Sequence, residues 1–182
     1  MWLGGSEHSF FSYNRDTFAR TSGSITKAGG DYQAAAAGNG LVYGGCHCGD
    51  FVYQDAYFWD NVGTNWTQAD KISLFGAWDQ ETHRYVQDFS PILEARAGYG
   101  VWAIFVDSRG IVWAGGDLSR SLRANFVSQW SGGYVRYAPA TRLPRRLRAV
   151  LRSRSPTRRQ RSVGTHRPTA ARSPMRSSRT TV

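Results

Sequence analysis

Apolar and polar residues alternate in short runs through the first 139 residues, and glycines with small polar residues separate one run from the next. Alternation with a period of two is typical of β-strands that bury one face, and the interruptions are typical of turns. A helical period is not sustained, because the alanine run at 34–37 is short and is followed directly by Gly38-Asn39-Gly40. The pattern predicts an all-β body.

One short phrase occurs three times along this body: apolar strand-forming residues, an aromatic residue and then glycines. Its residues are Trp2, Gly4 and Gly5 in the first copy, Tyr43, Gly44 and Gly45 in the second, and Trp113, Gly115 and Gly116 in the third. Aligned on the aromatic residue, the copies stand 41 and 70 residues apart. The first spacing is that of a four-stranded propeller blade, and the second is that of a blade with an insertion. The phrase predicts a partial β-propeller of two to three antiparallel blades over residues 1–139.

In a propeller, the glycines of this phrase would have a steric role. Where the inner strands of neighbouring blades converge there is little room for side chains. Glycine allows the backbones to approach closely and permits a bulge that redirects the chain. The apolar residues before the glycines are then expected to pack between neighbouring sheets. Ordinary loops also contain glycine pairs, and with 20 glycines in the chain this remains the alternative explanation.

The charge of the chain is divided unevenly. Residues 1–141 contain all 13 acidic residues and 10 of the 23 basic ones, whereas residues 142–182 contain 13 arginines and no acid. The net charge of +10 therefore arises in the C-terminal segment, and Tyr137 is the last aromatic residue. A segment with high net charge, no aromatic residue and few large aliphatic ones cannot bury enough surface to offset the entropy of ordering it. The sequence predicts a disordered basic tail over residues 140–182.

The segment 105–116 resembles the propeller repeat first recognised in two-component regulators. Its order is an apolar residue, Asp107, two polar residues, Gly110, apolar residues, Trp113 and then small residues with glycine. In the turn between two antiparallel strands, Asp107 is expected to accept a hydrogen bond from the backbone two residues on, and Gly110 to take a positive φ.

Three further segments look like the last blades of secreted bacterial propeller proteins of the actinobacterial type, namely 44–50, 66–71 and 129–139. In those proteins such blades commonly precede fibronectin type III modules. The resemblance implies a propeller fold and an extracellular location for the parent protein, and it names no reaction. The chain departs from the family because it has too few blades to close a ring. It also begins inside a repeat unit, which predicts upstream sequence in the parent. It shows no signal peptide and no apolar run of the ~20 residues that cross a bilayer.

The basic tail has three interpretations. Thirteen arginines can neutralise phosphates and give salt-dependent binding to nucleic acid, although no aromatic residue is interleaved to stack on bases. A solvated disordered arm is the second interpretation. The third is an out-of-frame translation, which we favour as a hypothesis. Codons for residues 164–169 can be chosen so that the neighbouring frame spells Trp-Asn-Ala-Ser-Thr-Asp, typical of the tryptophan strand of a fibronectin type III module.

Cys46, His47 and Cys48 form the densest group of potential ligands, with Asp50 beside them. Zinc sites usually add a second pair of cysteines or histidines, and the sequence has no such pair. Two states of Cys46 and Cys48 stay open: a disulfide, which secretion would favour, and two reduced thiols in a tight turn.

The insertion between Cys46 and Ser73 is rich in aromatic and acidic residues. Flat rings beside carboxylates can hold a sugar, and the same rings can pack a long loop onto its own sheet. We expect packing more than binding. The residues of this possible ligand-binding loop are His47, Asp50, Tyr57, Trp59, Trp66 and Asp70.

The sequence predicts no catalytic residue, no cofactor and no metal ligand set. Glycoside hydrolysis needs two carboxyl groups beside the bond, but the spacing favours neither Asp60 with Asp70 nor Asp79 with Glu81. A Gly-x-Ser-x-Gly elbow and a phosphate-binding Gly-Lys-Ser/Thr loop are both missing.

We therefore expect a non-catalytic extracellular binding or scaffold module of β-propeller type, with a glycan or a cell-surface protein as its partner. The alternatives are a fragment of a propeller-based polysaccharide hydrolase and nucleic-acid binding through the arginine-rich tail. Because a cut propeller exposes blade faces and edges, self-association is also expected.

Overall fold

The computed structural model describes residues 1–122 and 127–139, which belong to one compact unit. The predicted basic tail over residues 140–182 lies outside the described residues. The described part contains twelve strands and no helix, so the all-β prediction is confirmed. No helix in this part of the chain could span a membrane.

The strands form three sheets in which every pairing is antiparallel. The first sheet has the order β1-β2-β3-β6-β7, with strands Trp2–Gly4, Ser9–Tyr13, Arg20–Ala28, Gly49–Gln54 and Gln68–Lys71. The middle sheet has the order β4-β5-β8, with strands Tyr32–Gly38, Leu41–Cys46 and Phe75–Asp79. The third sheet contains β9 (Ile92–Val106), β10 (Val112–Leu122), β11 (Ser128–Trp130) and β12 (Tyr134–Tyr137). In this sheet β10 pairs with β9 on one side and with β11 and β12 on the other.

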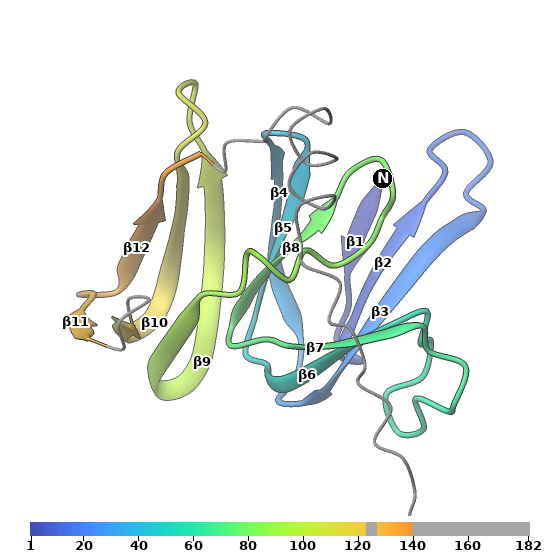
Figure 1. Ribbon diagram of the computed structural model, residues 1–182, viewed down its shortest axis with the longest axis horizontal. Coiled ribbons are helices and arrows are strands. Elements are labelled where there is room, and N and C mark those ends of the chain that lie inside the picture. Colours follow the sequence, from blue (N-terminus) through green and yellow to red (C-terminus); the bar gives the residue numbers. More distant parts are fainter. Residues whose placement is uncertain (123–126, 140–182) are drawn as a thin grey trace, which may run out of the picture. The chain divides into compact units, whose positions relative to one another are not determined.

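The three sheets lie side by side, with the middle one between the other two (Figure 1). Val42 and Trp78 are cross-strand partners in the middle sheet, and both belong to the cluster that packs against Phe10 of the first sheet. Their neighbours Tyr43 and Ala77 point the other way and belong to the cluster shared with the third sheet. Both faces of the middle sheet are therefore core.

The hairpin between β4 and β5 follows directly from its sequence. Asn39 and Gly40 form a two-residue loop, and both have positive φ, 58° and 69°. This is the conformation that Asn-Gly favours in a hairpin whose strands keep their natural twist. The Asn39 Nδ2 group donates to the carbonyl of Gly110 at 2.7 Å, so the tip of this hairpin contacts the turn between β9 and β10.

The insertion after Cys46 takes a different course from the one the sequence suggested. It was expected to pack as a loop onto its own sheet, but β6 and β7 extend the first sheet instead. Ser24 and Ile25 of β3 pair with Gln54 and Tyr53 of β6. The physical reason is that the edge of β3 offers unpaired backbone groups, and a returning strand satisfies them.

Two of the repeated glycines lie where one sheet touches the next. A Cβ atom on Gly4 would stand 2.7 Å from Cβ of Tyr32 in the middle sheet, and one on Gly45 would stand 2.4 Å from Cγ1 of Val101 in the third sheet. Gly115 is the equivalent residue of the third sheet, and the nearest described atom to a Cβ placed there is the carbonyl oxygen of Gly133, in the turn between β11 and β12, at 3.7 Å. A neighbouring sheet thus lies against two of the three equivalent glycines, whereas no residue of another sheet within 1–122 and 127–139 lies this close to the third.

The contrast between Gly45 and Gly115 generates a stability prediction. Gly45→Ala should destabilise the fold by about 1–3 kcal/mol, because the added methyl group overlaps Val101 in a packed interior. Gly115→Ala should cost less than Gly45→Ala, because its methyl group enters open space. Denaturant unfolding monitored by circular dichroism measures both.

A double variant makes this prediction specific. Val101→Ala removes Cγ1, the nearest of the Val101 atoms that the new methyl group would meet, so the combined variant should lose less stability than the sum of the two single variants. Strict additivity, or equal losses for Gly45→Ala and Gly115→Ala, would contradict the proposed contact.

Candidate functional site

The outer face of the third sheet carries a ladder of exposed aromatic residues. Val112, Ala114 and Val135 are buried toward the middle sheet. Successive residues of a strand alternate between faces, so Trp113 and the residues paired with it lie on the opposite side. Trp113 pairs with Phe105 of β9 and with Arg136 of β12. We call this side of the sheet the open face; its residues are Ala103, Phe105, Trp113, Gly115, Tyr134 and Arg136, with Trp130 of β11 beside them.

The aromatic residues of the open face are held in defined positions. The rings of Trp113 and Tyr134 are stacked with centroids 6.4 Å apart, and the Arg136 guanidinium lies 5.8 Å from the centre of the Trp113 ring. Trp130 is 75% exposed, and its ring lies against Gly132. A groove of about 860 Å³ runs between β10, β11 and β12. The described residues that line it include these three aromatic residues, Gln129 and Arg136, and none of them is Asp or Glu.

Asp107 anchors the turn that leads into this face. Its Oδ1 atom accepts the amide hydrogens of Arg109 and Ile111 at 2.9 and 3.0 Å, and Gly110 has a φ of 77°, as the Asp-x-x-Gly motif predicts. Its Oδ2 atom lies 2.8 Å from Arg109 and also accepts from Nε1 of Trp113. The hydrogen bonds from Arg109, with help from the Ile111 amide and the Trp113 indole, lower the pKa of Asp107 to about 2.

The aromatic residues of the possible ligand-binding loop pack against the first sheet. The Tyr57 ring lies over Gly23, and the guanidinium carbon of Arg20 lies 3.9 Å from the centre of that ring. Trp59 stacks on His8 with centroids 4.6 Å apart, and Trp66 meets Tyr53 edge to face at 5.5 Å. Packing outweighs binding here, because each of these rings already covers another side chain or a glycine.

The polar members of that possible loop each have a hydrogen-bond or ion-pair partner. The Nε2 atom of His47 accepts the amide hydrogen of Asp31, and the carboxylate of Asp50 pairs with Lys71 at 3.3 Å. Asp70 accepts hydrogen bonds from two glutamine side chains, those of Gln68 and Gln87. Of these residues of the possible ligand-binding loop, His47 precedes β6, Asp50 lies on β6 and Asp70 lies on β7, the strand paired with β6.

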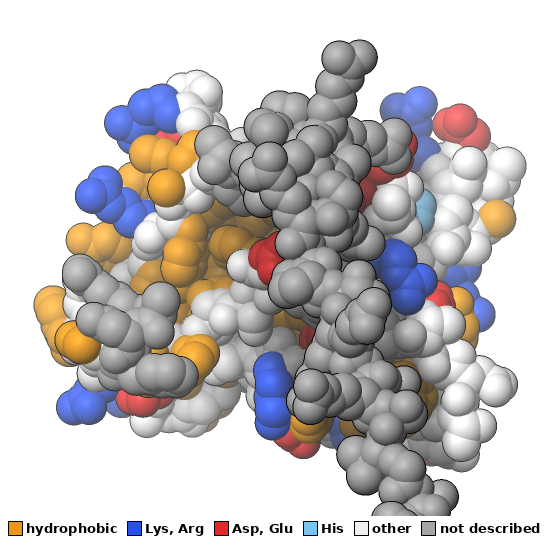
Figure 2. Space-filling model, viewed as in Figure 1, with side chains coloured by type: hydrophobic (Ala, Val, Ile, Leu, Met, Phe, Trp, Pro, Cys, Tyr) orange, Lys and Arg blue, Asp and Glu red, His pale blue; other side chains and the backbone are white. Residues whose placement is uncertain are grey.

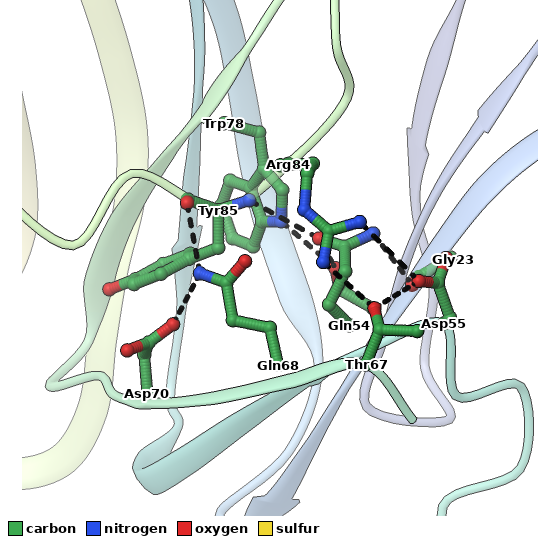
Figure 3. Close-up of polar contacts among 10 residues, drawn as sticks. Gly23, Gln54, Asp55, Thr67, Gln68, Asp70, Trp78, Arg84 and Tyr85 are labelled. Carbon is green, nitrogen blue, oxygen red and sulfur yellow. Dashed lines mark hydrogen bonds and ion pairs between the residues drawn. The ribbon is translucent and has the colours of Figure 1, made fainter. Parts of the chain in front are cut away.

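A buried polar network that sequence reasoning missed joins the first and middle sheets (Figure 3). Gln54 is fully buried: its Oε1 atom accepts from the Tyr85 amide at 3.2 Å and from Ser24 Oγ at 3.3 Å, and its Nε2 group donates to the Gly23 carbonyl. Ser24 Oγ in turn accepts from Nε1 of Trp78 at 2.9 Å. A glutamine within an apolar strand was the available signal, but its partners are distant in sequence.

The outer part of the network contains two carboxylates in separate roles. Asp55 accepts from the Thr67 hydroxyl and lies 3.7 Å from Arg84, while Gln68 Nε2 bridges Asp70 and the Tyr85 carbonyl (Figure 3). Burial raises the pKa of Tyr85 to about 12. These groups are engaged with one another, so the network serves to fasten the sheets together.

The carboxylate pairs considered for hydrolysis have ordinary structural uses. Oδ1 of Asp79 accepts the amide hydrogens of Glu81 and Thr82 in the turn after β8, and Asp60 accepts the amide of Asn61. Asp70 belongs to the network above. None of the four residues lines the groove of the open face.

The structure joins Cys46 and Cys48 in a disulfide with Cα atoms 5.1 Å apart, and both residues are buried. The chain turns here from β5 to β6, which redirects it from the middle sheet to the first. Within the ranges that the structure describes, no three His, Cys, Asp or Glu side chains gather in a way that could hold a metal ion.

Comparison of the chain with protein-family models, with curated protein sequences and with solved structures finds no match.

The electrostatics of Asp107 can be measured directly. Its pKa is lowered from 3.8 to about 2, so its contribution to stability is complete above 3.8 and is lost as the pH falls through about 2. Arg109→Gln should raise the pKa of Asp107, because it removes the side-chain hydrogen bond that contributes most to lowering that pKa. Carbon-detected NMR titration of the carboxyl group gives the midpoint.

Arg15→Gln is the matched control, since Arg15 forms an exposed pair with Asp16 at a distant turn. It should leave the Asp107 titration unchanged. A midpoint near 3.8 in the unmodified protein would show that the turn lacks the described contacts.

The state of the two cysteines is a separate prediction. Alkylation of the unfolded, unreduced protein should leave its mass unchanged, because Cys46 and Cys48 are paired. Alkylation after reduction should add two groups, and the whole chain contains two cysteines to receive them. Two groups added before reduction would contradict the pairing.

Proposed function

We propose that the three sheets are consecutive blades of a β-propeller, and that the chain is a non-catalytic extracellular binding or scaffold module. The observation that carries the proposal is the repeated close approach at Gly4 and Gly45, where each sheet receives a side chain from the first strand of the next. A recurrent contact of one kind between successive small sheets is expected of a repeat architecture. The Cys46–Cys48 disulfide supports the extracellular location, since disulfides persist in oxidising compartments.

The binding surface in this proposal is the open face of the third sheet. Phe105 is 63% exposed and Tyr134 is 59% exposed, beside the still more exposed Trp130. Contiguous exposed aromatic residues on a rigid sheet are typical of interaction sites. Figure 2 shows hydrophobic side chains gathered on this side of the molecule, over β11 and β12.

A non-catalytic role is favoured over hydrolysis by the chemistry of the groove. Glycoside hydrolysis needs an acid and a second carboxylate beside the bond, and the described lining of the groove offers neither. Nucleic-acid binding rests on the basic tail, which lies outside the described residues, and stays a prediction. It would appear as affinity that falls steeply with salt and is lost when the tail is removed.

Glycan binding on the open face is the second candidate function. The stacked pair Trp113 and Tyr134, with Trp130 nearby, offers flat apolar surfaces of the kind on which sugar rings stack. Gln129 and Arg136 line the same groove and can donate hydrogen bonds to hydroxyl or carboxyl groups.

The proposal is tested with the full chain and two defined probes. Native electrophoresis through gels that contain soluble polysaccharides, one neutral and one uronate-rich, reports glycan binding. Analytical ultracentrifugation of the chain alone reports association between copies. We expect at least one positive result that Phe105→Lys weakens by about tenfold or more, as loss of a central aromatic contact does.

The same samples test the non-catalytic assignment through a reducing-end assay, in which we expect no release of sugar. Negative results with both binding probes would overturn the proposal that the open face is a binding surface. Release of reducing ends would favour the hydrolase instead.

A further inference from the structure

The three sheets differ at the outer edge of their third strand. Each contains three successive antiparallel strands, in the orders β1-β2-β3, β4-β5-β8 and β9-β10-β12. In the first sheet β6 pairs with the outer edge of β3. In the middle sheet residues 84–86 run along the outer edge of β8, where the Val86 amide donates to the Ala77 carbonyl at 2.9 Å. In the third sheet, no strand among the described residues pairs with the outer edge of β12 (Figure 1).

We propose that the outer edge of β12 binds an extended peptide segment of a partner protein as an additional antiparallel strand. The inference rests on the proposed function, in which the third sheet carries the binding surface, and it names the class of partner. In recognition of this kind, backbone hydrogen bonds supply affinity and side chains supply specificity. A glycan and a second copy of the chain are competing occupants that the test distinguishes.

The backbone of β12 presents hydrogen-bonding groups on this outer side. The Gly116 amide donates to the Gly133 carbonyl at 2.9 Å, which makes these two residues a hydrogen-bonded pair of the ladder. Bonded and non-bonded pairs alternate along an antiparallel ladder, so the register makes Ala114 and Val135 the next bonded pair. Arg136 follows Val135, and its N–H and C=O groups therefore point away from β10. They can form both hydrogen bonds of one bonded pair with an added strand.

The groove follows this edge of the sheet. Its described lining includes all four residues of β12. Because successive residues of a strand point to opposite faces, a groove that touches all four runs beside the strand and is not confined to one face.

Two polar atoms of the groove residues also call for a partner. The hydroxyl oxygens of Ser131 and Tyr137 are buried without a hydrogen-bond partner among the described residues, and both residues line the groove. Buried polar groups are normally paired in native proteins. An occupant with polar backbone groups is therefore favoured over an apolar one.

The charge of the groove indicates the sequence of the occupant. Arg136 is exposed, and the described lining contains no Asp or Glu. A residue directly opposite Arg136 in an added strand lies beside its side chain, where opposite charges attract. The residues on either side of it point to the inner face, next to Val135 and Tyr137, which belong to the core or pack against it. The expected segment has an acidic residue between two apolar ones.

The same charge argues against an occupant from this chain. Residues 140–182, which lie outside the described residues, contain 13 arginines and no acidic residue, so they offer Arg136 only like charge. Edge-to-edge pairing of two copies centred on Arg136 would also place two like charges opposite each other, which is destabilising. A segment of a different protein meets neither obstacle.

The test uses the full chain and synthetic peptides in fluorescence-anisotropy titrations. The parent probe is fluorescein-labelled Ser-Thr-Val-Glu-Val-Thr-Ser with an amidated C-terminus. We expect saturable binding with a dissociation constant of about 1 mM or less. Methylation of the Glu backbone nitrogen removes the donor that faces Arg136, so it should weaken binding about tenfold or more.

A probe methylated at the backbone nitrogen of its first valine is the matched control. That nitrogen points away from β12 in the proposed pairing, so this probe should bind like the parent. Equal weakening by the two methyl groups would contradict strand addition.

Charge reversal tests the specificity. Arg136→Glu should weaken binding of the parent probe about fivefold or more, and it should strengthen binding of a probe with Lys in place of Glu. Arg15→Glu changes the net charge equally at an exposed position in the turn between β2 and β3, and it should leave both affinities unchanged. Circular dichroism melting identifies a variant that fails to fold, and the methylated probes test the inference on the unmodified protein.

The outcomes separate this inference from the proposed function. Absence of saturable binding by the parent probe would overturn the inference. Retardation by polysaccharide that Phe105→Lys weakens would then leave the proposed function standing. Self-association that the parent probe reverses would assign the edge to a second copy and overturn the choice of partner. If peptide, polysaccharide and a second copy all fail to bind, the inference and the proposed function both fail.

Discussion

The structure depends on close contact between small sheets at positions where one of them has no side chain. At Gly4 and Gly45 the neighbouring sheet approaches so closely that a methyl group would overlap Tyr32 or Val101. These contacts bring apolar faces together, and the packing of those faces excludes water from both sides of the middle sheet. The three-stranded middle sheet, with apolar residues on both faces, is the centre of the core.

Buried hydrogen bonds also join the first and middle sheets. Between the first and middle sheets, the buried amide of Gln54 satisfies backbone groups and the Ser24 hydroxyl that binds the Trp78 indole. A buried amide of this kind is costly unless it is fully bonded, so it specifies one arrangement of the two sheets. The apolar clusters supply most of the driving force, and this network fixes how the sheets meet.

The aromatic residues of the two outward-facing sheets differ in what covers them. The aromatic residues of the connection around Tyr57 are used to cover the first sheet. Those of the third sheet, Phe105 and Tyr134 among them, face solvent. The groove beside these aromatic residues has no carboxylate among its described lining residues, and this supports the proposal that the third sheet binds a partner.

The sequence by itself determined the local features of the chain: alternating strands, the Asn39-Gly40 hairpin and the Asp107–Gly110 turn, all of which depend on residues close together. It also marked the glycine phrase, although not which face each glycine would present. Only the tertiary structure decided that β6 and β7 join the first sheet, that Gln54 meets Tyr85, and that Tyr57 packs while Trp130 is exposed. The reason is that strand pairing uses backbone groups common to all residues, so the choice among edges is made by packing between segments distant in the sequence.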